Sequence, residues 1–346
     1  MSNIACEDSK EIPLVTIITP TYNSNKEYLF EAVSSVLQQT YPKIEYIITD
    51  DGSQYFPEKE VQQFLEEHAT GDNIVSWQIL KHETNVGTVK NMNAALQIAQ
   101  GEYIFGLAHD DIYYDERVIE EWVEEFQSTD AKIITGIRST KNLQTGMEEY
   151  LPTVAQRKQI RSLSPQRLFM KILRGNVISG ASTAYARACF QEYGLFDEEY
   201  RLLEDWPYYL KILSKGERIG MWDRPVIHYR WGGISNTKMP ASQLEADILN
   251  TRYKYHHILK IIQLKTFNDM VQYYFSWVQT YLCNNLSVAK KAIKNTHENK
   301  EPDSISWCQK NSLEKNIWIW IYRYGKVIRT TATSLKASRK ITLKKN

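Results

Sequence analysis

Short apolar runs alternate with amphipathic stretches over most of the chain, and this rhythm limits the folds open to it. Strands are predicted at 14–19, 44–49, 74–80, 103–107 and 132–137, and residues apolar at helical spacing follow each of the first four. Consecutive strand–helix units of this kind build a mostly parallel sheet with helices on both faces. We therefore expect an α/β, Rossmann-like fold.

Size and composition indicate a globular protein of about two domains. The 346 residues are 42% hydrophobic, 24% charged and 12% aromatic, which is typical of folded chains. No apolar run is long enough to span a membrane, and residues 1–11 lack a signal-peptide pattern, so a cytoplasmic protein is expected. The four cysteines form no Cys-x-x-Cys pair, which argues against a zinc ribbon, an iron–sulfur site or a thioredoxin-like motif.

Charge divides the chain into an acidic body and a basic C-terminal region. Residues 1–239 hold 24 Lys and Arg against 34 Asp and Glu, whereas residues 240–346 hold 18 against 7. Gly232, Gly233 and Pro240 mark a boundary between the two. We predict an α/β domain over 1–235 and a mainly helical, basic region over 236–346, with helices at 244–264, 267–282 and 286–293.

Polar residues stand directly after four of the predicted strands. They are Thr21 and Tyr22, the pair Asp50-Asp51, residues 82–87, and residues 109–111. Ligands of open α/β sheets bind beyond the carboxyl ends of the strands. Adjacent carboxylates are costly there unless they hold a cation or a polar ligand, because like charges raise each other's pKa.

The ligand is not expected to sit in a glycine cradle. No two glycines have the spacing of a dinucleotide-binding fingerprint, and no Gly-Lys-Ser/Thr phosphate loop is present, so a Rossmann dehydrogenase and a P-loop NTPase are both disfavoured. Mg²⁺ or Mn²⁺ held by one or two carboxylates can carry a diphosphate instead. Asp110 and Asp111 suit that task.

Six motifs occur in order along residues 12–235. They are Ile17 to Asn23 (IITPTYN), Asp50 to Ser53 (DDGS), Asn85 to Gly87 (NVG), Ala99 to Ile104 (AQGEYI), Asp110-Asp111 and Glu204-Asp205. Together they resemble the motifs of the inverting family 2 glycosyltransferases of the GT-A fold. The resemblance implies a nucleotide-sugar donor, with a UDP-sugar expected, and a divalent metal, Mn²⁺ or Mg²⁺.

The resemblance implies roles for the residues that follow the strands. Thr21, Tyr22 and Asp51 would surround the base and ribose, with Tyr22 stacking on the base and Asp51 accepting from its N–H. Asp111 would bind the metal, and Asp110 would lie near the ribose.

Three further residues, His109, His228 and Lys90, keep two interpretations each, and Arg230 has one. His109 stands where the family usually has the first Asp of its Asp-x-Asp motif, and is either a structural residue or a ligand. His228 is either a third metal ligand or a structural residue that ends a strand, while Arg230 is a candidate clamp on the diphosphate. Lys90 either reaches a phosphate or is a solvated helix residue.

Glu204-Asp205 matches the acidic pair of the family, in which Asp205 would be the general base. A carboxylate beside Glu204 and near Trp206 is expected to have a raised pKa. The alternative is a helix N-terminal charge that interacts with the helix dipole. Residues 180–182 and 194–197 fall where the family borders the acceptor.

The expected reaction is attack of an acceptor hydroxyl on the anomeric carbon with inversion, for example in bacterial surface polysaccharide synthesis. The acceptor would be a glycan or a polyprenyl-linked glycan. An inactive sugar-nucleotide-binding protein and a nucleotidyltransferase are the alternatives.

Beyond Glu314 the chain has basic and aromatic residues but no acidic ones. This composition fits either peripheral binding to the anionic inner face of the membrane or a solvated chain end. Binding of nucleic acid is disfavoured, because the body of the protein is acidic.

Overall fold

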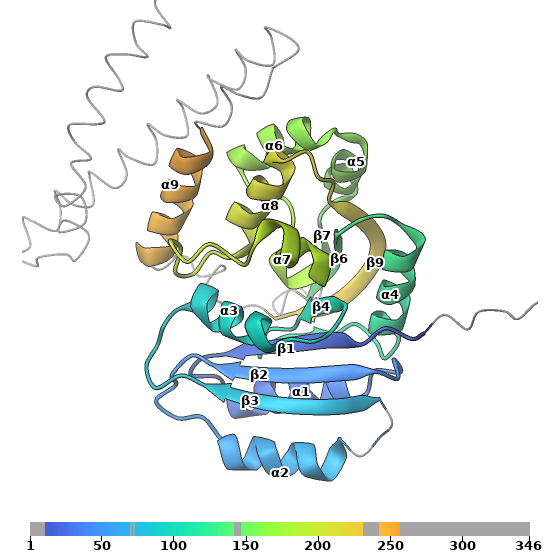
Figure 1. The fold of residues 1–346 in the computed structure, drawn as a ribbon, viewed down its shortest axis with the longest axis vertical. Helices are drawn as coiled ribbons and strands as arrows, with labels where there is room; N and C mark the ends of the chain where they lie inside the picture. Colours follow the sequence, from blue (N-terminus) through green and yellow to red (C-terminus); the bar gives the residue numbers. More distant parts are fainter. Residues whose placement is uncertain (1–10, 70, 72, 142–146, 231–241, 257–346) are drawn as a thin grey trace, which may run out of the picture. The chain divides into compact units, whose positions relative to one another are not determined.

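The computed structural model describes residues 11–69, 71, 73–141, 147–230 and 242–256 (Figure 1). The elements in chain order are β1 (Val15–Thr21), α1 (Lys26–Leu37), β2 (Ile44–Asp50), α2 (Glu58–His68), β3 (Ile74–Lys81), α3 (Thr88–Ile98), β4 (Tyr103–Gly106), β5 (Ile112–Tyr113), α4 (Val118–Ser128), β6 (Ile133–Lys141), β7 (Glu148–Leu151), α5 (Val154–Ser162), α6 (Pro165–Arg174), the 3-10 helix η1 (Gly180–Ser182), β8 (Thr183–Ala186), α7 (Arg187–Tyr193), α8 (Asp205–Ser214), β9 (Gly220–Tyr229) and α9 (Ser242–His256).

Contacts divide the chain into two units, Met1–Tyr273 and Tyr274–Asn346, and every described residue belongs to the first. The helix α9, which the predicted boundary assigned to the C-terminal region, packs against α6 and α8 of this unit. The predicted helices at 267–282 and 286–293 and the basic tail beyond Glu314 lie outside the described residues. No helix of the described part is both long and apolar enough to cross a bilayer.

The sheet has a parallel half and a mixed half. Its strand order is β3-β2-β1-β4-β8-β6-β9-β5, with β7 paired to β6. The first four strands run parallel, as the strand–helix rhythm predicts. Beyond β4, β8 is antiparallel to both of its neighbours, β6 and β9 are parallel, and β5 is antiparallel to β9. The α/β fold class is confirmed, with the parallel pairing concentrated in its first half.

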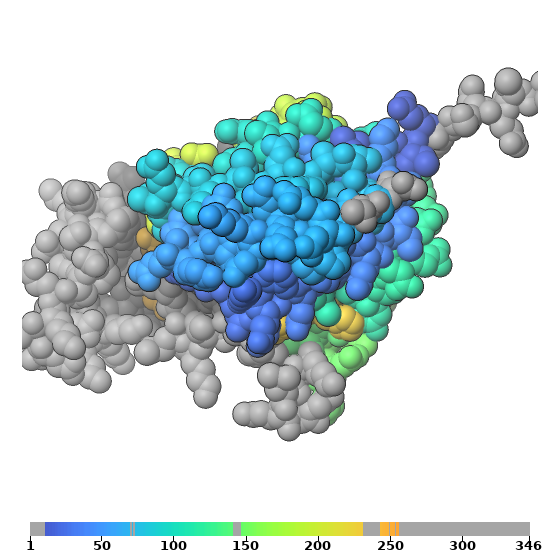
Figure 2. All heavy atoms as spheres, turned by 90° about the horizontal axis from the view of Figure 1, so that it is seen from below, coloured from blue at the N-terminus to red at the C-terminus, as the bar shows by residue number. Residues whose placement is uncertain are grey.

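One continuous apolar core lies between the sheet and the helices α1, α2 and α4. Alternate residues of β1 and β2 point into it, as the period of two in a strand requires. Figure 2 views the unit from the α2 side, where the surface is built mainly from the N-terminal half of the sheet and its helices. Core residues from these elements are Val15, Ile17, Leu29, Val33, Ile44, Tyr46, Ile48, Val61, Leu65, Val118 and Trp122.

The register brings the predicted polar residues to one edge of the sheet. Thr21 pairs with Asp50, and Asp50 pairs with Lys81, so β1, β2 and β3 end side by side. Because β8 is antiparallel to β4, with Phe105 opposite Ala184, the residues just before β8 lie at this edge too. The loops that follow β1, β2, β3 and β4 and the segment that precedes β8 therefore meet at one place.

Candidate active site

Asp51 fixes the loop that follows β3. Its carboxylate accepts hydrogen bonds from the backbone N–H groups of Val86, at 2.6 Å, and Gly87, at 3.0 and 3.1 Å, and from the Asn85 amide at 2.9 Å. Burial raises the pKa of Asp51, while these N–H groups and the charges of His82 and Arg201 oppose the rise. Asp51 thus orders the loop, and its contact with a base stays a prediction.

The side chains at the neighbouring strand ends differ in exposure. Tyr22 is 42% exposed, as a ring that stacks on a base must be, and Thr21 is buried beside it with its hydroxyl against Ser24. His82 follows β3 directly, and its Nε2 is buried without a partner among the described residues. His82 has no role in the expectations from sequence, although its place directly after a predicted strand was a usable signal.

Asp111 is the most unusual carboxylate at this edge. Its side chain is buried, and its Oδ1 accepts from the backbone N–H of Arg230 at 2.9 Å. Its Oδ2 is buried and has no partner in the described part of the chain. Burial, and then repulsion from Asp110, raises the pKa of Asp111 to about 8. A buried, unpartnered carboxylate oxygen is costly unless a cation or donor completes it.

The donor set at Asp111 fits a hard divalent cation. Mg²⁺ and Mn²⁺ are held through one or two carboxylates, with phosphate and water as the remaining ligands. Asp111 offers a free oxygen with Asp110 beside it, and the described residues contain no group of three or more His, Cys, Asp or Glu arranged to hold a metal. A site completed by the diphosphate of a donor agrees with both observations.

The two histidines have structural surroundings. The ring of His228 stacks on Tyr114, with centroids 4.5 Å apart, which favours the structural alternative for His228. Burial lowers the pKa of His109, and the charge of Asp110 and the backbone of Pro20 oppose this. His109 is therefore expected to be neutral and to support the loop before Asp110.

The charges of two arginines, Arg138 and Arg230, oppose the rise in the pKa of Asp111. Arg230 lies over the Tyr28 ring at 3.9 Å and pairs with Glu31, while its Nη1 is buried without a partner among the described residues. The charge of Arg138 also acts on Asp111, and the sequence analysis missed Arg138 because it lies inside a strand, β6. Lys90 is exposed in the first turn of α3, and its phosphate role stays a prediction.

Asp205 begins α8 and is half-buried beside the segment that precedes β8. Its carboxylate accepts from the backbone N–H of Trp206 at 2.6 Å and from the Asn176 amide at 3.3 Å. A Cβ on residue 180 would come within 2.8 Å of Asp205 Oδ2, so glycine at 180 permits this close approach. Burial raises the pKa of Asp205, and burial together with repulsion from Asp205 raises the pKa of Glu204.

The loop before Asp205 is held by residues that the sequence analysis did not identify. The guanidinium of Arg201 donates to the Asn85 and Val86 carbonyls, at 3.0 and 3.3 Å, and so joins this loop to the one that Asp51 orders. Asp247 of α9 is buried, and its Oδ2 accepts from the backbone N–H groups of Arg201, at 3.0 Å, and Leu202, at 2.7 Å. Helix α9 therefore anchors the chain three residues before the candidate base.

Replacing Asp247 tests this anchor. Asp247→Ala leaves the N–H groups of Arg201 and Leu202 without their acceptor, so we expect the free energy of unfolding in urea to fall by about 2 kcal/mol and turnover to fall with it. The matched control is Gln243→Ala, which removes only the 3.0 Å hydrogen bond to Asp247 Oδ1 and is expected to cost under about 0.5 kcal/mol. Equal stability of the two variants would contradict the role given to Asp247.

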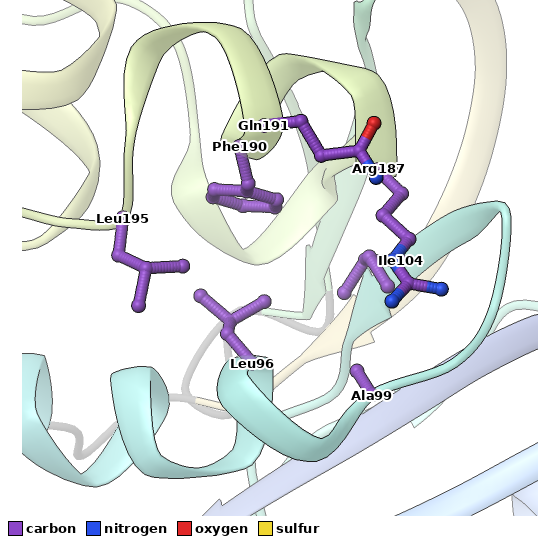
Figure 3. A pocket seen from close by; sticks show the side chains of 7 residues that line it. All are labelled: Leu96, Ala99, Ile104, Arg187, Phe190, Gln191 and Leu195. Atoms are coloured by element: carbon purple, nitrogen blue, oxygen red, sulfur yellow. The ribbon is translucent and has the colours of Figure 1, made fainter.

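An apolar pocket lies elsewhere, between the end of α3, the start of β4 and α7 (Figure 3). Leu96, Ala99, Ile104 and Phe190 line it, and Arg187 stands at its side. It contains no carboxylate and borders the start of β4, whereas the candidate active site gathers beyond the end of β4. The pocket is therefore not part of that site.

Comparison with protein families decides the class of this site. Residues 16–194, just over half of the chain, match glycosyl transferase family 2. The chain belongs to glycosyl transferase family 2. The resemblance drawn from the six motifs is confirmed, and with it the assignment of the chain as a glycosyltransferase.

Curated relatives of this family 2 glycosyltransferase carry the same general description. An uncharacterized glycosyltransferase of Rickettsia felis is 30% identical over 58% of this chain and 31% of its own length. EpsJ of Bacillus subtilis, also an uncharacterized glycosyltransferase, is 26% identical over 70% of this chain and 68% of its own length. Glycosyltransferase GlyG of Streptococcus pneumoniae is 35% identical over 36% of this chain and 38% of its own length. The matches thus span from about a third to two thirds of these relatives.

Solved structures confirm the GT-A-type fold of this glycosyltransferase. TarS 1-349 of S. aureus in complex with UDP superposes with a TM-score of 0.52 at 18% identity, covering 70% of this chain and 65% of that one. Mannosyltransferase PcManGT of Pyrobaculum calidifontis in complex with GDP-Man and Mn²⁺ gives 0.51 at 17% identity, covering 88% and 81%. At such identities the likeness concerns the fold.

Proposed function

We propose that this protein is an inverting glycosyltransferase that moves a sugar from a nucleoside diphosphate donor, a UDP-sugar first among them, to a hydroxyl of a glycan or lipid-linked glycan. The observation that carries the proposal is the unpartnered, buried Oδ2 of Asp111 at the edge of the sheet where Asp205 also lies. Such a transfer needs a carboxylate that can bind a metal ion at the donor side of the site. It also needs a carboxylate with a raised pKa at the acceptor side, to act as the general base.

The donor end of the site is built by the loops after β1, β2, β3 and β4. Tyr22 is exposed for stacking on the base, and Asp51 and His82 lie at the next strand ends to meet its edge. Asp111, with Asp110 beside it, would hold Mn²⁺ or Mg²⁺, and that ion would neutralise charge on the leaving diphosphate. Arg138 and Arg230 supply fixed positive charge to the same region.

The acceptor end is built around Asp205. Asn176 and the Trp206 N–H orient its carboxylate, and its raised pKa suits it to take a proton from an attacking hydroxyl. Attack from the side opposite the diphosphate inverts the anomeric carbon. One carboxylate suffices, because a nucleoside diphosphate leaves without the acid that glycosidases need.

The setting we propose is the synthesis of bacterial surface polysaccharide, at the inner face of the cell membrane. Its support is that relatives of this chain called glycosyltransferases come from bacteria.

A nucleotide panel tests the donor. Thermal unfolding is measured with UDP, GDP, CDP, dTDP and ADP, each with and without Mn²⁺. A ligand that binds only the folded state raises stability by RT ln(1 + [L]/Kd), so we expect one nucleotide, UDP first, to stand clear of the others and only with Mn²⁺. Stabilisation by UDP without any effect of Mn²⁺ would overturn the metal site, and no shift with any nucleotide would overturn the proposed function.

A further inference from the structure

Positive charge in the described body gathers on two consecutive helices. Residues 151–191 contain seven Lys and Arg and no Asp or Glu, whereas the rest of residues 1–239 holds 17 against 34. The seven basic residues fall mainly on α5 and α6, which lie at the end of the unit away from α2 (Figure 1). An anionic partner would be attracted to this end and repelled by the remainder of the body.

The helices present their charges in stripes. Thr153 and Gln156 form a capping box at the start of α5, and Ser164 caps α6 with Pro165 in its first turn, so both helices begin at defined residues. Residues three and four apart share one side of a helix. That spacing aligns Val154, Lys158 and Arg161 on α5, and Arg167, Lys171 and Arg174 on α6.

These stripes are open to solvent and only partly neutralised. Lys158, Arg161, Arg167 and Arg174 are exposed and Lys171 is half-buried. Arg161 and Arg157 pair with Asp223, at 3.1 and 2.7 Å, but Lys158, Arg167 and Lys171 form no ion pair among the described residues. Val154 is 73% exposed, the largest value among the exposed large hydrophobic residues of the described part.

The opposite side of α6 leads to the candidate base. Leu168, Phe169, Ile172 and Leu173 are buried, and the Ile172 carbonyl accepts from the Trp206 indole N–H at 2.9 Å. Two residues beyond the helix, Asn176 donates to Asp205. The surface that carries the positive charge is thus connected through one helix to the acceptor end of the site.

We infer that the basic stripes of α5 and α6 together form a docking surface for an anionic lipid bilayer, with Val154, Lys158 and Arg161 on α5 and Arg167, Lys171 and Arg174 on α6. Lys and Arg contact acidic headgroups, while an exposed apolar residue enters the interface. Val154, on the same stripe as Lys158, favours a bilayer over a purely ionic polymer. With the proposed function, on which this last step rests, docking would present a lipid-linked acceptor to the end of the site that holds Asp205.

Sedimentation of the full chain with vesicles tests the surface. Vesicles of phosphatidylcholine alone are compared with vesicles that also contain phosphatidylglycerol. The variant Lys158→Glu/Arg167→Glu/Lys171→Glu is compared with Lys59→Glu/Lys215→Glu/Arg218→Glu, which makes the same change in net charge at exposed residues outside α5 and α6. We expect the first variant to bind the anionic vesicles at least about tenfold more weakly than the second, and Val154→Ser to weaken binding as well.

Three results would overturn the inference. The first is that the wild-type protein does not sediment with anionic vesicles, and the second is that the two charge-reversed variants bind these vesicles equally well. The third is that the α5 and α6 variant loses binding to soluble polyphosphate but keeps its binding to vesicles, which would make this surface a site for an anionic polymer. An unchanged thermal shift with the active nucleotide and Mn²⁺ shows that each variant is folded, and the same triple change to Gln replaces the Glu variant if that shift is lost. Vesicle binding needs no sugar transfer, so its failure and failure of the proposed function are separable.

Discussion

Asp205→Asn is expected to lower turnover by about 100- to 10,000-fold while leaving nucleotide binding nearly unchanged. The Asn side chain keeps an oxygen that can accept from the Trp206 N–H, so the start of α8 is retained. What it loses is the capacity to take a proton from the acceptor hydroxyl. Transfer is measured with the nucleotide-sugar identified by the panel, and nucleotide binding by thermal shift.

The neighbouring carboxyl supplies the matched control. Glu204→Gln removes one acid of the pair but leaves Asp205 in contact with Asn176, and we expect it to retain most of the turnover. Loss of turnover in Glu204→Gln with retention in Asp205→Asn would move the base to Glu204. Equal turnover of Asp205→Asn and wild type would show that neither the base nor the mechanism is as proposed, and would leave the helix-dipole interpretation of Asp205.

The pH dependence follows from the raised pKa of Asp205. A general base must be deprotonated, so turnover is expected to fall as the pH drops through this pKa, which burial places above the ordinary value of 3.8. The pKa of Glu204 is raised further, to about 8, by burial and by the charge of Asp205, so Glu204 is already protonated where Asp205 titrates. Glu204→Gln is therefore expected to leave the acid limb of the profile close to its wild-type position, and a limb that moves strongly in this variant would show that Glu204 controls it.

Local sequence pattern predicted the first half of the sheet because each strand there is paired to its neighbours by repeated strand–helix units. The mixed half was less accessible. β5 has two residues, and β7 pairs only with the C-terminal part of β6. Helix α5 buries a single residue, Ile160. None of these three elements therefore shows a strong apolar periodicity. The parallel pairing of β6 with β9 joins residues about ninety positions apart through an irregular register, which no local pattern specifies.

The residues of the candidate site also fall into those that the sequence could predict and those that it could not. Asp51, Asp111 and Asp205 could be proposed from motifs, because they stand at strand or helix ends. Their partners could not be proposed. Arg201 and Asp247 act through the backbone of distant loops, so their residue types carried no recognisable spacing. The sequence therefore points to the candidate carboxylates, and the structure adds what holds them in position.

Asp111→Asn is expected to abolish the Mn²⁺-dependent part of nucleotide binding and to lower turnover more than about 100-fold, since a metal at the leaving diphosphate supplies several kcal/mol. The Asn oxygen can still accept from the Arg230 N–H. Asp110→Asn is the matched control, because it removes the neighbouring charge and leaves the buried oxygen in place. We expect it to weaken metal binding less.

Stability separates a functional Asp111 from a structural one. Burial raises the pKa of Asp111 to about 8, so folding of the metal-free protein at neutral pH must either protonate this carboxyl or bury its charge, and a neutral amide removes that cost. Without metal or nucleotide, Asp111→Asn should therefore be at least as stable as wild type in urea at neutral pH. If Asp111 had only a structural role, the same change would lower the stability of the protein. A variant that is less stable but fully active would therefore refute the metal site. The unpartnered oxygen predicts the opposite, a variant that is stable but inactive.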